Sequence, residues 1–160
     1  MRIKLHIIAS LLLTVAAAQT GYAQMAKVGC MDQGIRVQGE QIKHDFKAQG
    51  MEIYKDAMLT MSSKDPYPIA VQLTQGTLYQ FVFVGNKDAS KLYFELFDGA
   101  DTKLVDKVVE NKGSNNFMIY SFIPQKTDLY LLIVSQKVKG NREVCGSFTV
   151  MQKANGGNTQ

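Results

Sequence analysis

The stretch LYQFVFV at residues 78–84 decides the fold, because apolar side chains occupy both of its alternating faces. Successive side chains of a β-strand point to opposite sides of the sheet, so this pattern predicts an inner strand that is buried on both sides. The stretch LYLLIV at 129–134 is likewise apolar on both faces. These two segments indicate a β-rich chain, in which apolar and polar residues alternate with a period of two.

Segments of alternating apolar and polar residues recur outward from these two, and turn residues separate them. Residues 62–68 form an expected turn, in which Pro66 and Pro68 break any ladder, and DGAD at 98–101 predicts a tight turn. A parallel α/β fold needs a helix between its strands, and the spacing leaves no room for one. The sequence predicts an all-β, antiparallel, jelly-roll-like β-sandwich of about eight strands. The expected strands are 53–61, 69–73, 78–84, 92–97, 104–110, 117–123, 129–134 and 144–151.

One short N-terminal helix is expected at about residues 39–49. Ile42 and Phe46 are spaced i, i+4 and share one face, while charged residues occupy the others. Gly50 is well placed to end the helix in the left-handed conformation. An extended arm is the alternative, since eleven residues are marginal as a helix without packing.

The first 23 residues have the composition of a cleavable signal peptide. Arg2 and Lys4 precede an apolar run over 5–18, and Gly21 and Ala23 supply the small residues before a cut that would leave Gln24 first. The run is shorter than the roughly 20 residues of a membrane span. We expect export to the periplasm or the cell exterior, one domain over 24–153, a disordered tail over 154–160, and no transmembrane segment after cleavage.

Lipid attachment to Cys30 is the competing fate of the leader. Lys27 stands where a lipidation site needs an apolar residue, and Cys30 lies well beyond the apolar run. In an oxidising compartment two cysteines usually pair, so a Cys30–Cys145 disulfide is expected. A redox pair or a metal site would be the functional alternative, but the CxxC spacing and the nearby histidines that would favour it are absent.

Charge and motifs exclude several classes of function. Loss of the leader lowers the net charge from +4 to +2, and the basic stretch 137–142 is typical of a polar hairpin loop, so no nucleic-acid partner is expected. His44 is the one histidine left after cleavage, and a solvated surface position is expected for it. The Gly-x-Ser-x-Gly, P-loop and dinucleotide motifs are absent. We therefore expect no catalytic residues, no metal and no cofactor.

Two acidic groupings of the sequence are candidate sites. Asp98, Asp101 and Asp106 lack the spacing of an EF-hand, and turn formation explains them better than calcium. Glu95 and Asp98 form a carboxylate pair near one strand end, which is the arrangement that a small hydrolase would use.

Tyrosines are the candidate ligand contacts, because the chain contains no tryptophan on which a sugar could stack. Candidates lie on the less apolar strand faces or in a loop, although aromatic residues also favour strands for packing alone. The candidates are Tyr54, Tyr67, Tyr93 and Tyr120.

Residues 69–134 resemble the bacterial pre-peptidase C-terminal domains and related jelly-roll modules. The resemblance is carried by VQLTQGTLYQF at 71–81, LYFELFD at 92–98 and FIPQKTDLYLLIV at 122–134. It implies a jelly-roll sandwich that serves as a non-catalytic accessory or binding module, with no catalytic residues to carry over. The chain departs from the pattern in its N-terminal helix and in Lys126-Thr127-Asp128, where a glycine is usual.

The leading hypothesis is an exported, non-enzymatic module that binds a glycan or an envelope protein of unknown identity. One alternative is an envelope assembly factor that docks through the helix at 39–49. The other is a small hydrolase that uses Glu95 and Asp98.

Overall fold

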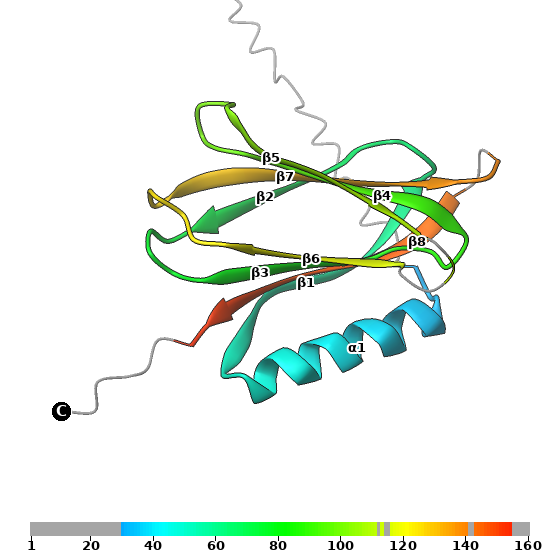
Figure 1. Cartoon of the computed structure of the whole chain (residues 1–160), viewed down its shortest axis with the longest axis horizontal. Coiled ribbons are helices and arrows are strands. Elements are labelled where there is room, and N and C mark those ends of the chain that lie inside the picture. The colour runs from blue at the N-terminus through cyan, green and yellow to red at the C-terminus, as the bar shows by residue number, and fades with distance from the viewer. Residues whose placement is uncertain (1–29, 112, 114–115, 141–142, 155–160) are drawn as a thin grey trace, which may run out of the picture.

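Two four-stranded sheets packed face to face, with one helix outside them, make up the part of the chain that the computed structural model describes (Figure 1). That part comprises residues 30–111, 113, 116–140 and 143–154. The expected signal peptide and the expected tail after residue 154 lie outside it. Among the described residues, no helix combines the length and apolar character needed to cross a membrane.

The strand order is that of a jelly roll, as the sequence predicts. Sheet A has the order β1-β8-β3-β6 and sheet B the order β2-β7-β4-β5, and every neighbouring pair is antiparallel. The strands are β1 (Met51–Ser62), β2 (Tyr67–Leu73), β3 (Tyr79–Val84), β4 (Ala89–Phe97), β5 (Lys103–Glu110), β6 (Phe117–Phe122), β7 (Asp128–Val138) and β8 (Glu143–Lys153).

The core lies between the sheets and is built from one face of each strand. β3 is an inner strand of sheet A, which confirms the prediction, and β7 is an inner strand of sheet B. The rings of Phe81 on β3 and Phe94 on β4 pack across the sandwich with centroids 5.6 Å apart. Leu132 and Val134 of β7 are completely buried. Each such side chain contributes roughly 1.5–3 kcal/mol through burial.

The helix, α1 (Gln33–Ala48), begins six residues before the predicted start and ends one residue before the predicted end. Asp32 caps its first turn, because the side-chain Oδ1 accepts a hydrogen bond from the N–H of Ile35 at 3.1 Å. Gly39 lies within the helix and faces β8. A Cβ at this position would lie only 3.3 Å from the Ser147 hydroxyl oxygen, so the glycine allows α1 to approach β8 closely. Gly50 has a φ of +78°, which confirms the predicted left-handed residue after the helix.

α1 covers the outer face of sheet A. Ile42 and Phe46 share the buried side of the helix, as predicted, together with Ile35. They pack against Val82 and Val84, the outward-facing residues of β3. Figure 1 shows α1 along this sheet only, on the side away from sheet B.

Tyr67 and Pro68 were predicted to lie in a turn, and this was wrong, because they are the first two residues of β2 and pair with Val134 and Ile133 of β7. β2 is the edge strand of sheet B. A proline is tolerated in an edge strand where the missing N–H would have pointed away from the ladder. The turn is therefore confined to residues 63–66.

A disulfide joins Cys30 to Cys145, as predicted, with their Cα atoms 5.5 Å apart and a sequence separation of 115 residues. Cys30 lies just before α1, and Cys145 projects from β8 toward the helix. The bridge therefore attaches the start of α1 to the sheet that the helix covers.

Replacing Cys30 with Ser is expected to lower the free energy of unfolding by about 3–5 kcal/mol, because the bridge closes a loop of more than a hundred residues. Urea denaturation followed by far-UV circular dichroism measures the effect. Met31→Ser, at the exposed neighbouring position, is the matched control and is expected to change little. A loss below about 0.5 kcal/mol for Cys30→Ser would contradict a stabilising role.

Candidate functional site

The four candidate tyrosines lie in three different places. Tyr54 on β1 and Tyr67 on β2 lie along the same open edge of the sandwich, where the first strand of sheet A passes the first strand of sheet B. Tyr93 lies on the outer face of sheet B, and Tyr120 lies on β6 at the opposite edge. The structure therefore brings together only two of the predicted contacts.

Side chains of β1 bridge to the backbone of β2 along this edge. The Tyr54 hydroxyl donates to the Gln72 carbonyl at 2.7 Å, and the Lys55 Nζ donates to the Ala70 carbonyl at 2.9 Å. The pairing of β1 with β8 shifts register between Ile53 and Lys55, which makes Tyr54 the irregular residue of a β-bulge. These bonds use two outward-facing carbonyl groups of the β2 edge.

A groove of about 340 Å³ opens beside these bridges, and we call it the β1–β2 groove. Buried apolar side chains contribute to its lining, and Tyr67, 36% exposed, and Lys55 are its polar members. None of the ion pairs among the described residues involves Lys55. The apolar members named here are Leu59, Pro68, Ile69 and Phe148.

Sequence reasoning missed both Lys55 and Pro68 as groove residues. A lysine in a strand with a period of two carries no signal that distinguishes it from other solvated lysines. Pro68 was assigned to a turn. Only the passage of β1 along the edge of β2 brings Lys55 beside Tyr67 and Pro68, and that arrangement depends on the order of the strands.

Tyr120 is engaged by its own surroundings at the opposite edge of the sandwich. Its ring packs against Phe94 with centroids 5.6 Å apart, and the Lys107 ammonium lies 5.6 Å from its ring centre. Lys107 also donates to the Ile119 carbonyl at 3.1 Å, so it bridges β5 to β6 much as Lys55 bridges β1 to β2. Little of the Tyr120 ring is left for a ligand.

The carboxylate pair is held by other groups. Glu95 forms an ion pair with Lys103, which also contacts Asp106. Asp98 accepts hydrogen bonds from the N–H groups of Thr102 and Ala100, at 2.8 and 3.0 Å, and these bonds hold the pKa of its carboxyl below the usual value. A glycosidase needs one carboxyl with a raised pKa to act as the acid. Asp98 therefore stabilises the turn at 98–101, which is the role that the turn interpretation of the sequence predicted for it.

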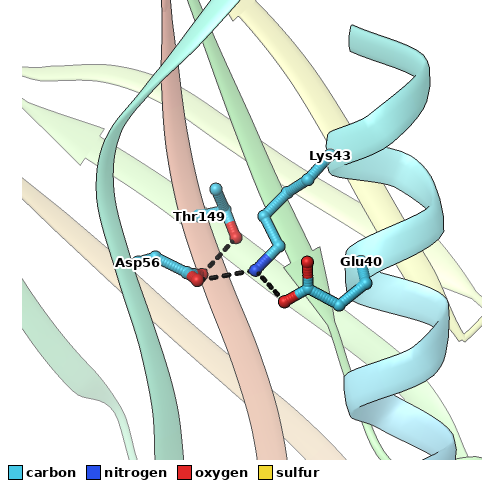
Figure 2. Close-up of polar contacts among 4 residues, drawn as sticks. All are labelled: Glu40, Lys43, Asp56 and Thr149. Carbon is cyan, nitrogen blue, oxygen red and sulfur yellow. Dashed lines mark hydrogen bonds and ion pairs between the residues drawn. The ribbon is translucent and has the colours of Figure 1, made fainter. Parts of the chain in front are cut away.

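A charge network around one buried lysine joins α1 to sheet A (Figure 2). Lys43 is only 4% exposed, and its Nζ lies 2.6 Å from Asp56 Oδ2 on β1 and 2.7 Å from Glu40 Oε1. The Thr149 hydroxyl donates to the second Asp56 oxygen at 2.7 Å. Figure 2 shows the lysine reaching from the helix between the two carboxylates. The two carboxylates therefore compensate the positive charge of the buried Lys43 ammonium.

The Lys43 ammonium remains charged in this network. Burial lowers its pKa, but the hydrogen bonds to Asp56 and Glu40 raise it more, so the pKa lies above the ordinary 10.5. A nucleophilic lysine needs a lowered pKa. Lys43 is therefore a structural residue that attaches α1 to β1.

His44 is exposed on α1, as predicted, and its Nδ1 lies 3.6 Å from the Asp45 carboxylate. Within the described ranges, no group of three or more His, Cys, Asp or Glu side chains is arranged to hold a metal ion. Asp98 binds backbone N–H groups, and Asp106 binds Lys103. Asp98 and Asp106 of the acidic grouping thus have partners within the protein.

No protein-family model and no curated protein sequence matches this chain. Some solved structures are distantly similar to it. PliG of Aeromonas hydrophila, a periplasmic inhibitor of g-type lysozyme, is 15% identical over 61% of this chain and 85% of its own, with a TM-score of 0.43. A CBM4 structure is 13% identical over 64% of this chain and 78% of its own, with a TM-score of 0.38. These distant β-sandwich-like folds carry neither a ligand nor an activity over to this chain.

Asp56→Ala is expected to lower the free energy of unfolding by about 2–3 kcal/mol, because it leaves the buried Lys43 ammonium with Glu40 alone. Lys91→Ala, which removes the exposed pair with Glu110, is the control and is expected to leave the urea midpoint unchanged.

The same Asp56→Ala variant, compared with wild type, tests the charge of Lys43. A raised lysine pKa contributes stability that is fully present below the pKa of the unfolded chain and is lost as the pH rises through the folded value. The difference between wild type and Asp56→Ala should therefore be constant from about pH 6 to about pH 10 and should shrink above that. A difference that shrinks already near neutral pH would contradict the charged network.

Proposed function

We propose that this protein is an exported, non-catalytic binding module, and that its ligand, a glycan or an envelope protein, occupies the β1–β2 groove. One observation carries the proposal. Tyr54, Lys55 and Tyr67 lie along one open edge of the sandwich, beside a groove with an apolar lining. Aromatic rings, a cation and apolar walls are the contacts that fix and orient a ligand in a concave site.

The geometry of the edge favours a glycan over an extended peptide. A peptide that adds a strand to a sheet needs free N–H and C=O groups along the edge. On β2, the Ala70 and Gln72 carbonyls are already bonded to Lys55 and Tyr54, and Pro68 has no N–H. The Tyr67 ring and the remaining Lys55 protons stay available for the faces and hydroxyl groups of a sugar.

Export supports the same proposal. The Cys30–Cys145 disulfide fits an oxidising compartment, where such bridges form and persist. The proposed leader, residues 1–23, would deliver the protein there. The resemblance of residues 69–134 to pre-peptidase C-terminal domains also implies an accessory module instead of an enzyme.

The two alternatives have less support from the contacts. A docking helix would need a free apolar side, and Ile35, Ile42 and Phe46 of α1 are packed on the protein's own sheet. A hydrolase would need Glu95 or Asp98 as an acid, and both carboxylates are engaged by Lys103 or by backbone N–H groups. No observation favours either alternative over the groove.

Tyr67→Ala and Lys55→Gln are each expected to weaken binding roughly tenfold, which corresponds to about 1.4 kcal/mol. A glycan array probed with the mature chain identifies the ligand, and calorimetric titration of that glycan measures the loss. Tyr93→Ala removes the same type of ring from the outer face of sheet B and is the matched control. Equal binding by Tyr67→Ala and wild type would contradict the proposed site.

A protein ligand is tested by affinity purification of the tagged mature protein from its own envelope fraction. The proposal expects a co-purified protein to be lost with Tyr67→Ala and Lys55→Gln. It expects that protein to be retained with Val37→Lys, which changes an exposed position on α1. The opposite result would support docking through the helix and overturn the groove.

A further inference from the structure

The basic stretch at 137–142, for which the sequence predicts a hairpin loop, instead connects the two sheets. β7 ends in sheet B at Val138, and β8 begins in sheet A at Glu143. The turn at 63–66 makes the opposite crossing, from β1 in sheet A to β2 in sheet B. Both connections lie at one end of the sandwich, because Ser62 of β1 pairs with Glu143 of β8.

Hydrogen bonds hold these two connections against each other. The buried Ser63 donates its hydroxyl to the Val138 carbonyl at 2.9 Å and accepts from the Val138 N–H at 3.0 Å. The Lys64 N–H donates to the Gln136 carbonyl at 2.8 Å. Gln136 is itself completely buried, and its side-chain amide donates to the Cys145 carbonyl of β8 at 2.8 Å. The two connections are therefore held in one arrangement before any ligand binds.

A hollow of about 360 Å³ lies where the two connections meet, and we call it the lysine hollow. Lys64 reaches it from the turn after β1, whereas Lys137 and Lys139 reach it from the end of β7, and all three are exposed. No acidic side chain is among its described lining residues. The lining consists of Ser63, Lys64, Lys137, Val138, Lys139 and Gly140.

The three ammonium groups have no partner among the described residues, because no ion pair and no side-chain hydrogen bond there uses them. Lys91 and Lys103, by contrast, form ion pairs on sheet B. Asp65 and Glu143 lie at the same end of the sandwich, and no ion pair within the described ranges joins either of them to a lysine of the hollow. Three like charges around one hollow repel one another, and a bound anion would compensate them.

The backbone at Lys64 gives a second observation. Its φ is +73°, in the left-handed region that glycine and asparagine adopt at the least cost. A turn that needed only this conformation would form more easily with glycine at the position. A lysine held there at a cost in backbone strain indicates that its side chain has a use.

We propose that the lysine hollow binds a phosphate group, either of a phospholipid headgroup or of a soluble phosphate ester. A phosphate presents charged oxygens in several directions, so it can accept from ammonium groups on several sides, and each of these acts as a point charge. A planar carboxylate is better matched by the fork of an arginine. The volume of the hollow leaves room for part of the molecule that carries the phosphate.

Titration of the isotope-labelled mature chain with inorganic phosphate tests the site, followed by amide NMR shifts at constant ionic strength and about pH 8, where phosphate is doubly charged. We expect saturable shifts at Lys64 and Lys139, with a millimolar dissociation constant. Lys64→Gly and Lys139→Gln should each raise that constant about two- to fivefold, the effect of one exposed ion pair. Lys47→Gln, which removes an exposed lysine from α1, is the control and should leave it unchanged.

Lys64→Gly also separates the charge from the fold. Glycine adopts a φ of +73° without strain, so the thermal midpoint is expected to change little while phosphate binding weakens. Equal phosphate binding by wild type and Lys64→Gly would overturn the proposal. Equal shifts with chloride at the same ionic strength would overturn it too, because they would report screening alone.

Vesicles distinguish the two sources of the phosphate group. Sedimentation with vesicles of phosphatidylglycerol and phosphatidylcholine in equal parts, lost when all three lysines are replaced by glutamine, would identify a lipid headgroup. Saturable phosphate binding without vesicle binding would identify a soluble ester. Vesicle binding without saturable phosphate binding would indicate a nonspecific basic surface and would overturn the proposal. Tyr67→Ala is expected to leave phosphate binding unaltered, so this test is separate from that of the β1–β2 groove.

Discussion

Two strands with apolar side chains on both faces impose the architecture of this protein. β3 and β7 each bury one face in the core, and each then needs a second cover for the other. Sheet A meets this need with α1, which is attached by the Cys30–Cys145 bridge and by the Lys43 network. The bridge, the ion pairs of the buried Lys43 and the close approach at Gly39 all keep one helix against one sheet. On sheet B the outward side chains of β7, Leu131 and Ile133, have no such helix over them among the described residues and are half-buried.

At both edges of the sandwich, a lysine side chain of one edge strand donates a hydrogen bond to a backbone carbonyl of the edge strand beside it. At one edge the Lys55 ammonium donates to a β2 carbonyl, and at the other the Lys107 ammonium donates to a β6 carbonyl. Exposed edge strands invite pairing with other chains, and charged residues together with Pro68 discourage it. The edges differ in what remains accessible. Lys107 also covers the ring of Tyr120, whereas Lys55 leaves Tyr67 open beside a groove. This difference makes the first edge the better candidate for binding.

Alternation of apolar residues was enough to predict the strands, their antiparallel sandwich and the inner position of β3, because burial on a sheet follows a strict period of two. Oxidising conditions and two cysteines were enough to predict the bridge. The first six residues of α1 were missed because Gly39 interrupts the helical pattern, and its role depends on Ser147 of a distant strand. Pro68 was misplaced because its tolerance depends on β2 being an edge strand. Lys55 and Lys43 gave no signal, since only the tertiary arrangement distinguishes them from solvated lysines.

The attachment of α1 to β8 also governs the order in which the chain can fold. β1 pairs with β8, α1 packs on β8, and Cys30 bonds to Cys145 within β8. The N-terminal helix and β1 therefore gain their strand pairing and their disulfide only when the final strand of the sandwich has been synthesised. Contacts between such distant segments slow folding, because loop closure must come before the contacts that stabilise it. The last strand to be synthesised therefore completes sheet A for the first strand of the chain.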